Sequence, residues 1–403
     1  MALKLFVGLK NLKIFWNGSP LVRTISNIKY DDIVINTTKS PRKKPEKGSQ
    51  LPFGEIMSDH MLVVNWTAKS GWSAPKINPY DFIPMHPSSS VLHYGLACFE
   101  GMKAYKSANG NIYMFRPNEN MNRFHKSSTR LSMPGFDKDE LLKCIAELVR
   151  VDQSWIPDAE NSSLYIRPTM ISTESTLGVR PPASAMLFVI TGPVGPYFST
   201  GIFKPISLLA DPSFIRSWPG GIGDIKAGGN YAPTIYPQRI AESKGCAQCL
   251  WLYNDEVTEV GTMNIFMHWI NEQGEEELIT PALNGLILPG VTRKSLLELA
   301  REWNEFKVSE KSFTIQQMIK AANEGRIKEV LGAGTACVVL PIEKILYNNE
   351  FVRVDTPNGF PLSQRLFKEL TDIQYGRKSH HWSYLVSSNE TLDLMKKKQK
   401  VAF

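Results

Sequence analysis

A single lysine, Lys226, lies in the glycine-rich stretch GIGDIKAGGNY (residues 221–231), and its surroundings allow three interpretations. The stretch could cradle a nucleotide phosphate, or it could be a solvated surface turn. Alternatively, the glycines could let the backbone approach a bulky cofactor while the lysine amine bonds to it. Each interpretation predicts different neighbours elsewhere in the chain, so the rest of the sequence can discriminate between them.

The nucleotide-binding interpretations fail at particular positions. A Walker phosphate loop requires GxxxxGK[ST]; Gly223 and Gly228 have the right separation, but Gly229 and Asn230 follow them. A dinucleotide fingerprint requires GxGxxG, and Lys226 stands where its third glycine belongs. Considered alone, a lysine in such a loop is most often a solvated residue.

Elsewhere the chain contains the residue types that a protein needs to bind pyridoxal phosphate. A lysine that holds this cofactor needs an acid at the pyridine nitrogen, an anchor for the phosphate and a donor to the ring oxygen. Glu259 in TEVGTMN, Arg123 in FRPNENMNRF and Tyr231 are candidates for these roles. The stretch LILPGVTRKSLLELA predicts a strand, a turn and a helix, so N–H groups near Val291 and Thr292 can face an anion. Singly, each residue is better explained as an exposed or structural side chain, and only their joint occurrence favours the cofactor.

The first half of the chain predicts strands and one clear helix. HMLVVNW, NIYMFR, SLYIRPTMI and AMLFVITGPV have the β-branched and aromatic content of strands. DKDELLKCIAELVR predicts a helix, because Asp137 and Glu140 have capping-box spacing and the apolar residues that follow share one face. The Gly- and Pro-rich stretch GPVGPYFSTGIFKP predicts a domain boundary.

The second half alternates between strands and helices. ISLLA, CLWLY, NIFMHWI and EELIT predict strands, whereas APTIYPQRIAESK, RKSLLELAREWNE, FTIQQMIKAANEG and PLSQRLFKELTDIQ predict helices. The sequence therefore predicts two α/β domains with a cleft between them. We expect an N-terminal domain (51–196), a linker (197–210), a C-terminal domain (211–386) and a loose basic tail (387–403).

The positive charge of the chain is concentrated at its start. The net charge is +7, but the first 50 residues hold ten of the 46 basic and three of the 39 acidic residues, which leaves 36 of each. This neutral body argues against a nucleic-acid partner. Residues 1–30 contain five basic residues and no acid, which predicts a mitochondrial transit peptide, with a plain basic arm as the alternative. Residues 31–50 are expected to be a basic linker, and no apolar run approaches the roughly 18 residues of a membrane span.

The cysteines and paired histidines predict no metal or disulfide framework. Five cysteines are too few for such a framework, and their odd number indicates free thiols. CAQC (246–249) has redox or zinc spacing, but there is no second CxxC, so packing is favoured over redox chemistry. The pair in SHHWS (379–383) lacks further ligands nearby and predicts surface residues.

Several motifs together resemble the branched-chain amino-acid aminotransferases of the animal type. They are HYGLACFEGMKAY, FRPNENMNRF, LYIRP, GDIKAGGNYAPT, VTEVGTMNIF, LPGVTRKSLLELA and GAGTAC, in family order over about residues 50–385. The resemblance implies a two-domain, fold-type IV pyridoxal phosphate enzyme, similar in fold to D-amino-acid aminotransferase. It also implies that the N-terminal domain is the smaller and that the larger C-terminal domain binds the cofactor. The enzyme would be a homodimer with the cofactor in the cleft between the domains.

The resemblance implies a role for each matching residue. Lys226 matches the lysine that forms the Schiff base, Glu259 the acid at the pyridinium, and Tyr231 the tyrosine near the ring hydroxyl. Arg123, Val291, Thr292 and Thr335 match the phosphate site. The positions that match the substrate pocket are Phe53, Tyr94, Phe99, Tyr165, Arg167, Val179, Tyr197, Thr262, Thr335 and Ala336. The mammalian redox CxxC is absent, because Cys337 is followed by Leu340 in place of the second cysteine.

The implied reaction converts L-leucine, L-isoleucine or L-valine and 2-oxoglutarate into branched 2-oxo acids and L-glutamate. It would follow a ping-pong cycle in which Lys226 carries the substrate proton. An apolar pocket distinguishes one methylene by only about 1–3 kcal/mol, so minor substrates such as methionine are expected. The alternatives are a D-amino-acid aminotransferase or an aminodeoxychorismate lyase of the same fold type, or a catalytically idle scaffold.

Overall fold

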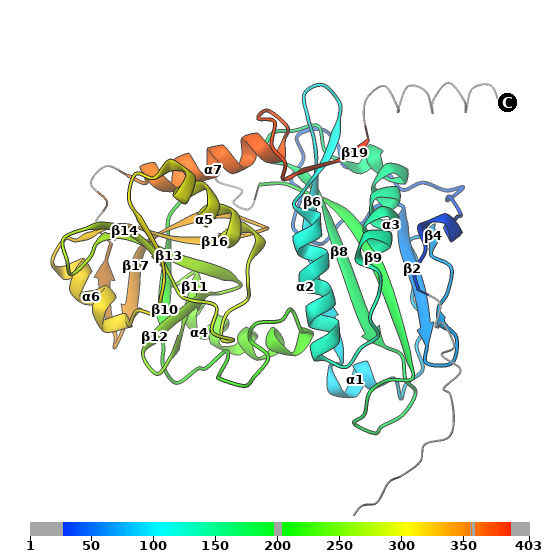
Figure 1. Cartoon of the computed structure of the whole chain (residues 1–403), viewed down its shortest axis with the longest axis horizontal. Coiled ribbons are helices and arrows are strands. Elements are labelled where there is room, and N and C mark those ends of the chain that lie inside the picture. The colour runs from blue at the N-terminus through cyan, green and yellow to red at the C-terminus, as the bar shows by residue number, and fades with distance from the viewer. Residues whose placement is uncertain (1–26, 197–203, 355, 357–358, 388–403) are drawn as a thin grey trace, which may run out of the picture.

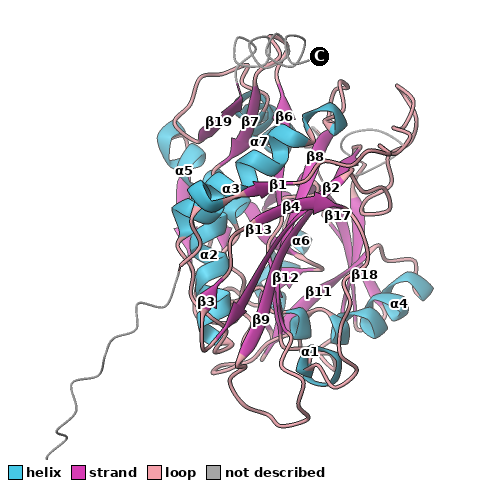
Figure 2. Cartoon of the chain, turned by 90° about the vertical axis from the view of Figure 1, so that its right-hand side faces the viewer, coloured by secondary structure: helices cyan, strands magenta, loops and turns pink. Residues whose placement is uncertain are grey.

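The computed structural model describes residues 27–196, 204–354, 356 and 359–387. They form two α/β halves that lie side by side, each built around one sheet (Figure 1). In Figure 2 the N-terminal half faces the viewer, and its long strands run across the molecule in front of the C-terminal half. Among the described residues, no helix has both the length and the apolar character needed to cross a membrane.

The N-terminal sheet is built mainly from antiparallel pairs. Its strand order is β1 (Val34–Ile35), β4 (Lys76–Pro79), β2 (His60–Thr67), β9 (Ser184–Val194), β8 (Ser163–Ser172), β6 (Met102–Lys106), β7 (Ile112–Phe115) and β19 (Ser383–Ser387); β3 (Gly71–Trp72) pairs with β2 and β5 (Ala97–Phe99) with β8. Helices α2 (Pro117–Arg130) and α3 (Lys138–Val151) cover one face (Figure 1), and the short helix α1 (Ser90–Tyr94) precedes β5. Single 3-10 turns occur at Tyr30–Asp32 and Gln153–Trp155. The core between sheet and helices is apolar and contains Phe124, Leu141 and Ile166.

The C-terminal sheet closes into a barrel. Its order is β12 (Glu256–Val260), β11 (Gln248–Tyr253), β10 (Ile206–Ala210), β17 (Val338–Tyr347), β16 (Ile327–Gly334), β13 (Met263–Ile270), β14 (Glu276–Thr280) and β15 (Lys307–Glu310), and β18 (Glu350–Arg353) pairs with β17. Because β12 also pairs with β13, the strands from β12 through β13 form a ring. The helices are α4 (Ile235–Ser243), α5 (Val291–Trp303), α6 (Ile315–Asn323) and α7 (Pro361–Gln374), with 3-10 turns at Gly228–Asn230 and Ala232–Thr234.

Helices α2 and α5 join the two halves through polar contacts. Arg116, at the start of α2, donates from both terminal nitrogens to the Glu298 carboxylate on α5, at 2.8 and 3.0 Å. Lys294 on α5 donates to Glu119 on α2 at 2.5 Å. A paired, bidentate arginine–carboxylate contact fixes direction as well as distance. The two helices are therefore held in a defined relative position, and both carry residues of the site.

Most predicted elements are present, but α2 is not among the predicted helices. The predicted helix 137–150 is α3, and Asp137 accepts the N–H groups of Asp139 and Glu140 at 3.0 Å. The Glu140 carboxylate does not close the capping box; it accepts the Tyr30 N–H at 2.7 Å. Helix α2 carries no continuous apolar stripe, because its buried face includes Asn120 and Arg123.

Two predicted boundaries of the C-terminal half are wrong. The predicted linker 197–210 ends too late, because Ile206–Ala210 forms β10, a parallel neighbour of β11 and β17 in the barrel. The predicted C-terminal domain 211–386 also ends too late. After α7 the chain returns to the first half, where Ser383–Ser387 pairs with β7. Residues 197–203 of the linker and 388–403 of the tail lie outside the described residues.

The predicted basic linker 31–50 is attached to the N-terminal half along its length. Val34–Ile35 pairs in parallel with β4, and the Thr38 N–H donates to His60 Nε2 at 2.9 Å. The end of the predicted transit peptide is also part of the fold, because Ile28 is 1% exposed and packs in the N-terminal core. The structure therefore assigns residues 27–50 to the folded body, whereas residues 1–26 lie outside the described residues.

Ile28→Ala is expected to lower the free energy of unfolding of the N-terminal half by about 2–4 kcal/mol, because it leaves a cavity in a core. Val34, which is 43% exposed, provides the matched control, and Val34→Ala should change stability by less than about 0.5 kcal/mol. Urea titrations followed by tryptophan fluorescence would measure both. Equal stability of Ile28→Ala and the parent chain would contradict the assignment of residue 28 to the core.

Candidate active site

The backbone of Lys226 is clamped at the junction of the two halves. Its carbonyl accepts the N–H of Phe99 at the end of β5, at 3.0 Å. Its own N–H donates to the Ser127 hydroxyl on α2, also at 3.0 Å. The Asn230 side chain closes the loop by donating to the carbonyls of Ile222 and Ile225 at 2.7 and 2.9 Å. This loop is therefore not a free surface turn, and both halves determine where the lysine lies.

The Lys226 amine lies against two aromatic side chains. Its Nζ is 3.0 Å from the Tyr231 hydroxyl and 4.8 Å from the centre of the Phe99 ring. The two rings are themselves 4.9 Å apart. Among the described residues, no ion pair joins this amine to an acid. The Tyr231 hydroxyl and the face of the Phe99 ring thus hold the amine in position. Because no carboxylate of the described residues pairs with it, the amine can react with a bound molecule.

An aromatic wall leads away from the lysine. The Arg167 guanidinium lies 4.7 Å from the centre of the Phe99 ring and donates to the Tyr165 hydroxyl at 3.1 Å. Phe53 meets the Tyr165 ring edge-on, at 4.8 Å between centres. Gly101 is required here, because a Cβ at that position would lie 2.1 Å from the Tyr165 hydroxyl oxygen. Four predicted substrate residues thus form one continuous surface that begins at Lys226.

Glu259 is buried at the end of β12, where the barrel closes. One of its carboxylate oxygens accepts the N–H of Leu288 at 3.1 Å and the Asn264 amide at 3.3 Å. The other oxygen, Oε2, lies 2.5 Å from Nη1 of Arg216 but has no donor in hydrogen-bond geometry. Burial raises the pKa of Glu259, and the nearby charges of Arg216, Lys226 and Arg123 only partly oppose this. Glu259 is thus a buried acid, ion-paired with Arg216, that has one carboxylate oxygen without a hydrogen-bond donor.

Arg123 forms the second buried charged pair of the site. Its Nε and Nη2 donate to the Glu100 carboxylate at 2.6 and 2.8 Å, and its Nη1 donates to the Pro289 carbonyl at 3.1 Å. Burial alone would raise the pKa of Glu100, but the charge and hydrogen bonds of Arg123, with Lys226 and Asn120, hold that pKa below its ordinary value. Arg123 is thereby fixed beside the turn that begins α5.

The first turn of α5 has the geometry of an anion-binding site. Gly290 is the residue before the helix, and no side chain caps the first turn, which begins with the buried residues Val291 and Thr292. Uncapped N–H groups at a helix start attract anions. Close by, the Thr335 hydroxyl is 3.5 Å from the Gly101 carbonyl, next to Glu100. The four residues predicted for the phosphate lie on elements that meet at this point.

Four polar residues of the site were not predicted from the sequence: Glu100, Lys103, Arg216 and Asn264. Glu100 lies inside the motif HYGLACFEGMKAY, and a lone acid in an apolar run is the signal that could have identified it. Lys103 is the one buried lysine among the described residues; its amine donates to the Ala336 carbonyl at 3.0 Å, and burial lowers its pKa to about 8. Arg216 and Asn264 follow no local pattern.

Some predicted pocket residues are not buried at this site in the single chain. Val179 is 85% exposed and Tyr94 is 47% exposed, and the Tyr94 hydroxyl donates to the Leu177 carbonyl. Thr262 is exposed in the turn between β12 and β13. Tyr197 lies outside the described residues.

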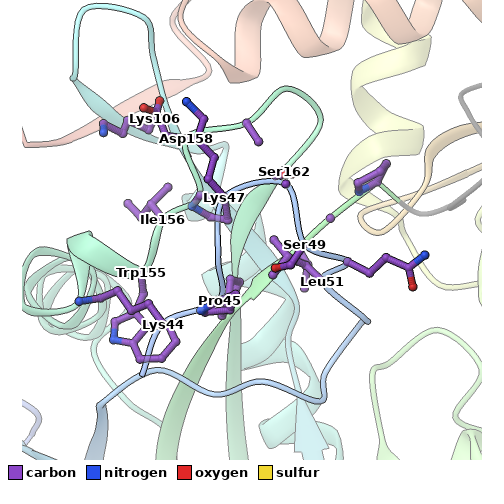
Figure 3. A pocket seen from close by; sticks show the side chains of 18 of the residues that line it. Lys44, Pro45, Lys47, Ser49, Leu51, Lys106, Trp155, Ile156, Asp158 and Ser162 are labelled. Atoms are coloured by element: carbon purple, nitrogen blue, oxygen red, sulfur yellow. The ribbon is translucent and has the colours of Figure 1, made fainter. Parts of the chain in front are cut away.

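A cavity of about 810 Å³ adjoins the aromatic wall. It is lined by residues 44–53, the loop 153–162 and the side chains of Lys103 and Lys106 (Figure 3). Figure 3 shows Lys44 beside Trp155, and the amine is 5.6 Å from the centre of that ring. Phe53 and Ala336 line this cavity as well, so it opens beside the predicted substrate residues and not around Lys226.

The remaining motifs do not form reactive centres in the described residues. Cys246 and Cys249 are buried against Leu209 and Trp251, and burial raises both thiol pKa values, that of Cys249 to about 12. This supports the packing interpretation of CAQC. His380 and His381 stack on each other near Trp382, and no group of three or more potential metal ligands occurs in the described part of the chain.

Comparison with protein families and curated proteins gives consistent matches. The family described as amino-transferase class IV matches residues 97–345. The branched-chain-amino-acid aminotransferase of Monosiga brevicollis is 52% identical over 374 residues, which is 92% of this chain and 95% of the relative. The mitochondrial enzyme of that name from Mus musculus is 49% identical over 94% of this chain and 97% of its own length. The cytosolic one from Ovis aries is 49% identical over 90% and 95%, respectively.

Solved structures share the fold at lower identity. The branched-chain amino acid aminotransferase of Escherichia coli has a TM-score of 0.67 at 24% identity and covers 82% of this chain and 99% of its own. The corresponding T.th. enzyme, solved with pyridoxamine 5'-phosphate, has a TM-score of 0.65 at 25% identity over 80% of this chain and 98% of its own.

Glu100→Gln is expected to destabilise the protein by about 3–5 kcal/mol at pH 7, because it leaves Arg123 buried without its counter-charge. The pKa of Glu100 is lowered in the folded state, so its ionised form contributes stability above pH 4.5. That contribution disappears as the pH falls through the lowered pKa. Urea unfolding at pH 7 and at successively lower pH would therefore show a shrinking difference from the parent chain. The exposed Glu46→Gln is the control, and a Glu100→Gln difference independent of pH would contradict this assignment.

Proposed function

Because this chain belongs to the class IV aminotransferase family, we propose that it is a branched-chain amino-acid transaminase that uses pyridoxal phosphate. It would transfer the amino group of L-leucine, L-isoleucine or L-valine to 2-oxoglutarate and release L-glutamate. The observation that carries the proposal is the position of the Lys226 amine, set against the Tyr231 hydroxyl and the Phe99 ring where the two halves meet.

The residues of the cleft fit this cofactor. Glu259 Oε2 is buried and lies 2.5 Å from Arg216 Nη1, but it accepts no hydrogen bond, so it could accept one from a pyridine N–H. The uncapped first turn of α5 and Arg123 would hold the phosphate, with Thr335 close to them. Lys226 would hold the aldehyde carbon, and Tyr231 would bond to the ring oxygen. The T.th. relative was solved with pyridoxamine 5'-phosphate, the aminated form of the same cofactor.

Different residues of the protein would transfer the proton, bind the ring nitrogen and contact the substrate side chain. When bound, pyridoxal phosphate supplies an electron-withdrawing ring that stabilises negative charge at the substrate α-carbon. The Lys226 amine would take the proton from that carbon and return it, because it is half-buried and, among the described residues, forms no ion pair with an acid. Glu259 would accept a hydrogen bond from the ring nitrogen and so favour its protonated form. The aromatic wall of Phe53, Phe99 and Tyr165 would contact an aliphatic side chain.

A second copy of the chain would complete the pocket. The surface of α1 and the loop 173–183 exposes Leu92, Tyr94, Leu177 and Val179, and the two segments are joined by the bridge between Ser89 and Ser175. They lie at one end of the N-terminal half (Figure 1). Exposed apolar groups gathered in one place are typical of an interface. We infer a homodimer in which this surface is covered and Val179 approaches a substrate site.

We also propose a mitochondrial location for the enzyme. The basic, acid-free sequence before Asp31 supports it, and relatives of this chain include mitochondrial as well as cytosolic enzymes. The packing of Ile28 requires that a removable leader end before that residue.

Lys226→Ala is expected to reduce transamination of L-leucine with 2-oxoglutarate by at least about 10³-fold, because it removes the proton carrier. Lys244→Ala, on the exposed end of α4, should leave the rate unchanged. Borohydride reduction of the parent protein followed by peptide mapping should place the cofactor on residue 226. Turnover of D-alanine alone, or a label on another lysine, would contradict the proposed function.

Val179→Glu is expected to shift the protein toward monomer and to raise the KM for L-leucine, because a charge would be buried at the interface. Phe351→Glu is the control, because it introduces the same charge at an exposed position of β18. It should change neither the oligomeric state nor the KM. Light scattering coupled to size-exclusion chromatography would report the mass. A Val179→Glu protein that remains dimeric with an unchanged KM would refute the inferred interface.

A further inference from the structure

Arg216 forms a buried ion pair with Glu259 that no predicted role explains. Its Nη1 lies 2.5 Å from Glu259 Oε2, and the two side chains are 4% and 3% exposed. An arginine buried this completely costs several kcal/mol in lost hydration unless its charge is compensated. Glu259 is its only ion-pair partner among the described residues. The guanidinium is therefore in position to act on the acid that faces the cofactor.

The other groups around Glu259 do not replace this charge. The Leu288 N–H and the Asn264 amide are neutral donors to Oε1. Lys226, Arg123 and Arg293 are the other cations that favour ionised Glu259. Each has a partner of its own: Tyr231, Glu100 and Glu310, respectively. Arg216 has the largest effect among these charges, although burial still raises the pKa of Glu259.

The loop that carries Arg216 is tied to the segment that binds Glu259. The Ser217 hydroxyl donates to the Leu286 carbonyl at 2.6 Å, two residues before the Leu288 N–H. Gly223 permits this approach, because a Cβ there would lie 2.5 Å from the Leu286 carbonyl oxygen. The same loop continues to Lys226. One loop thus positions both the reactive amine and the cation beside the buried acid.

We propose that Arg216 is a positioning residue that keeps Glu259 in its carboxylate form, so that the proton between Glu259 and the cofactor's ring nitrogen stays on the nitrogen. Without the guanidinium, the carboxylate becomes more basic and takes that proton. The ring then loses its positive charge and with it much of its capacity to accept electrons. This inference rests on the proposed function, since it needs a pyridine ring in the cleft.

The first measurement uses the full chain without cofactor, so it does not depend on the proposed function. Arg216→Met raises the pKa of Glu259 further above that of an unfolded chain. The folded protein then binds a proton that the unfolded chain has released, so stability falls as the pH rises. The unfolding temperature of Arg216→Met should therefore drop increasingly below that of the parent chain between pH 5 and pH 9. Arg216→Lys, which keeps the charge, should recover most of this loss.

The double variant separates a local charge effect from a general structural one. In Arg216→Met/Glu259→Gln the acid is absent, so the pH-dependent loss should vanish. If Arg216→Met fails to fold, the double variant should still fold. A double variant that is as unstable as Arg216→Met, or a loss that does not change with pH, would overturn the proposal.

The second measurement examines the loaded protein with ¹⁵N-labelled pyridoxal phosphate. The ring nitrogen of the parent chain and of Arg216→Lys should resonate as a protonated pyridine at pH 7.5, whereas that of Arg216→Met should shift toward the unprotonated position. An unchanged shift in Arg216→Met would overturn the proposal. Failure of the parent chain itself to bind the cofactor would instead refute the proposed function.

Discussion

The buried charges at the junction of the two halves are the constraint on which the rest of the site depends. Glu100 and Arg123 come from the N-terminal half, while Arg216 and Glu259 come from the C-terminal half. Each pair removes two ions from water, and the cost is recovered only when the partners meet at short distance with their remaining hydrogen bonds satisfied. Arg123 also links the two halves directly, because its Nη1 donates a hydrogen bond to the carbonyl of Pro289, which precedes α5. The arrangement of charges therefore determines how the two halves meet.

The Lys226 loop depends on that arrangement. Its backbone bonds to Phe99 and to Ser127, so a shift of β5 or α2 would move the lysine. The same loop carries Arg216 and is fastened to the segment before α5 by Ser217. A reactive amine needs this degree of support, because a displacement of about 1 Å can cost 10²-fold in rate. Rigid elements on both sides supply it, although the lysine itself lies outside any helix or strand.

The sequence predicted the elements of regular periodicity and the residues carried by the family motifs. The helix that begins after Asp137 and the strands of both halves have the apolar patterns expected of them. Helix α2 does not, because its buried face carries Asn120, Arg123 and Ser127, which serve the site and not the core. The aromatic wall lies where the motifs indicated, whereas Val179 is 85% exposed and Tyr94 is 47% exposed.

The unpredicted residues share a physical cause. Glu100 and Arg216 act through partners that are distant in the sequence. An apolar run around a lone acid marks Glu100 but does not reveal Arg123 as its partner, and no local pattern marks Arg216. The end of the linker at β10 and the return of the chain to β19 are equally non-local, since each is determined by which strand it pairs with.

The position of strand β19 has a consequence for how the protein folds during its synthesis. It covers the outer edge of β7, so the N-terminal sheet is complete only after the chain has been synthesised as far as Ser387. Until then β7 presents an open row of backbone donors and acceptors, to which another strand can add. Nascent or truncated chains that stop before residue 383 would thus be prone to aggregate, even though every residue of the cleft is already present.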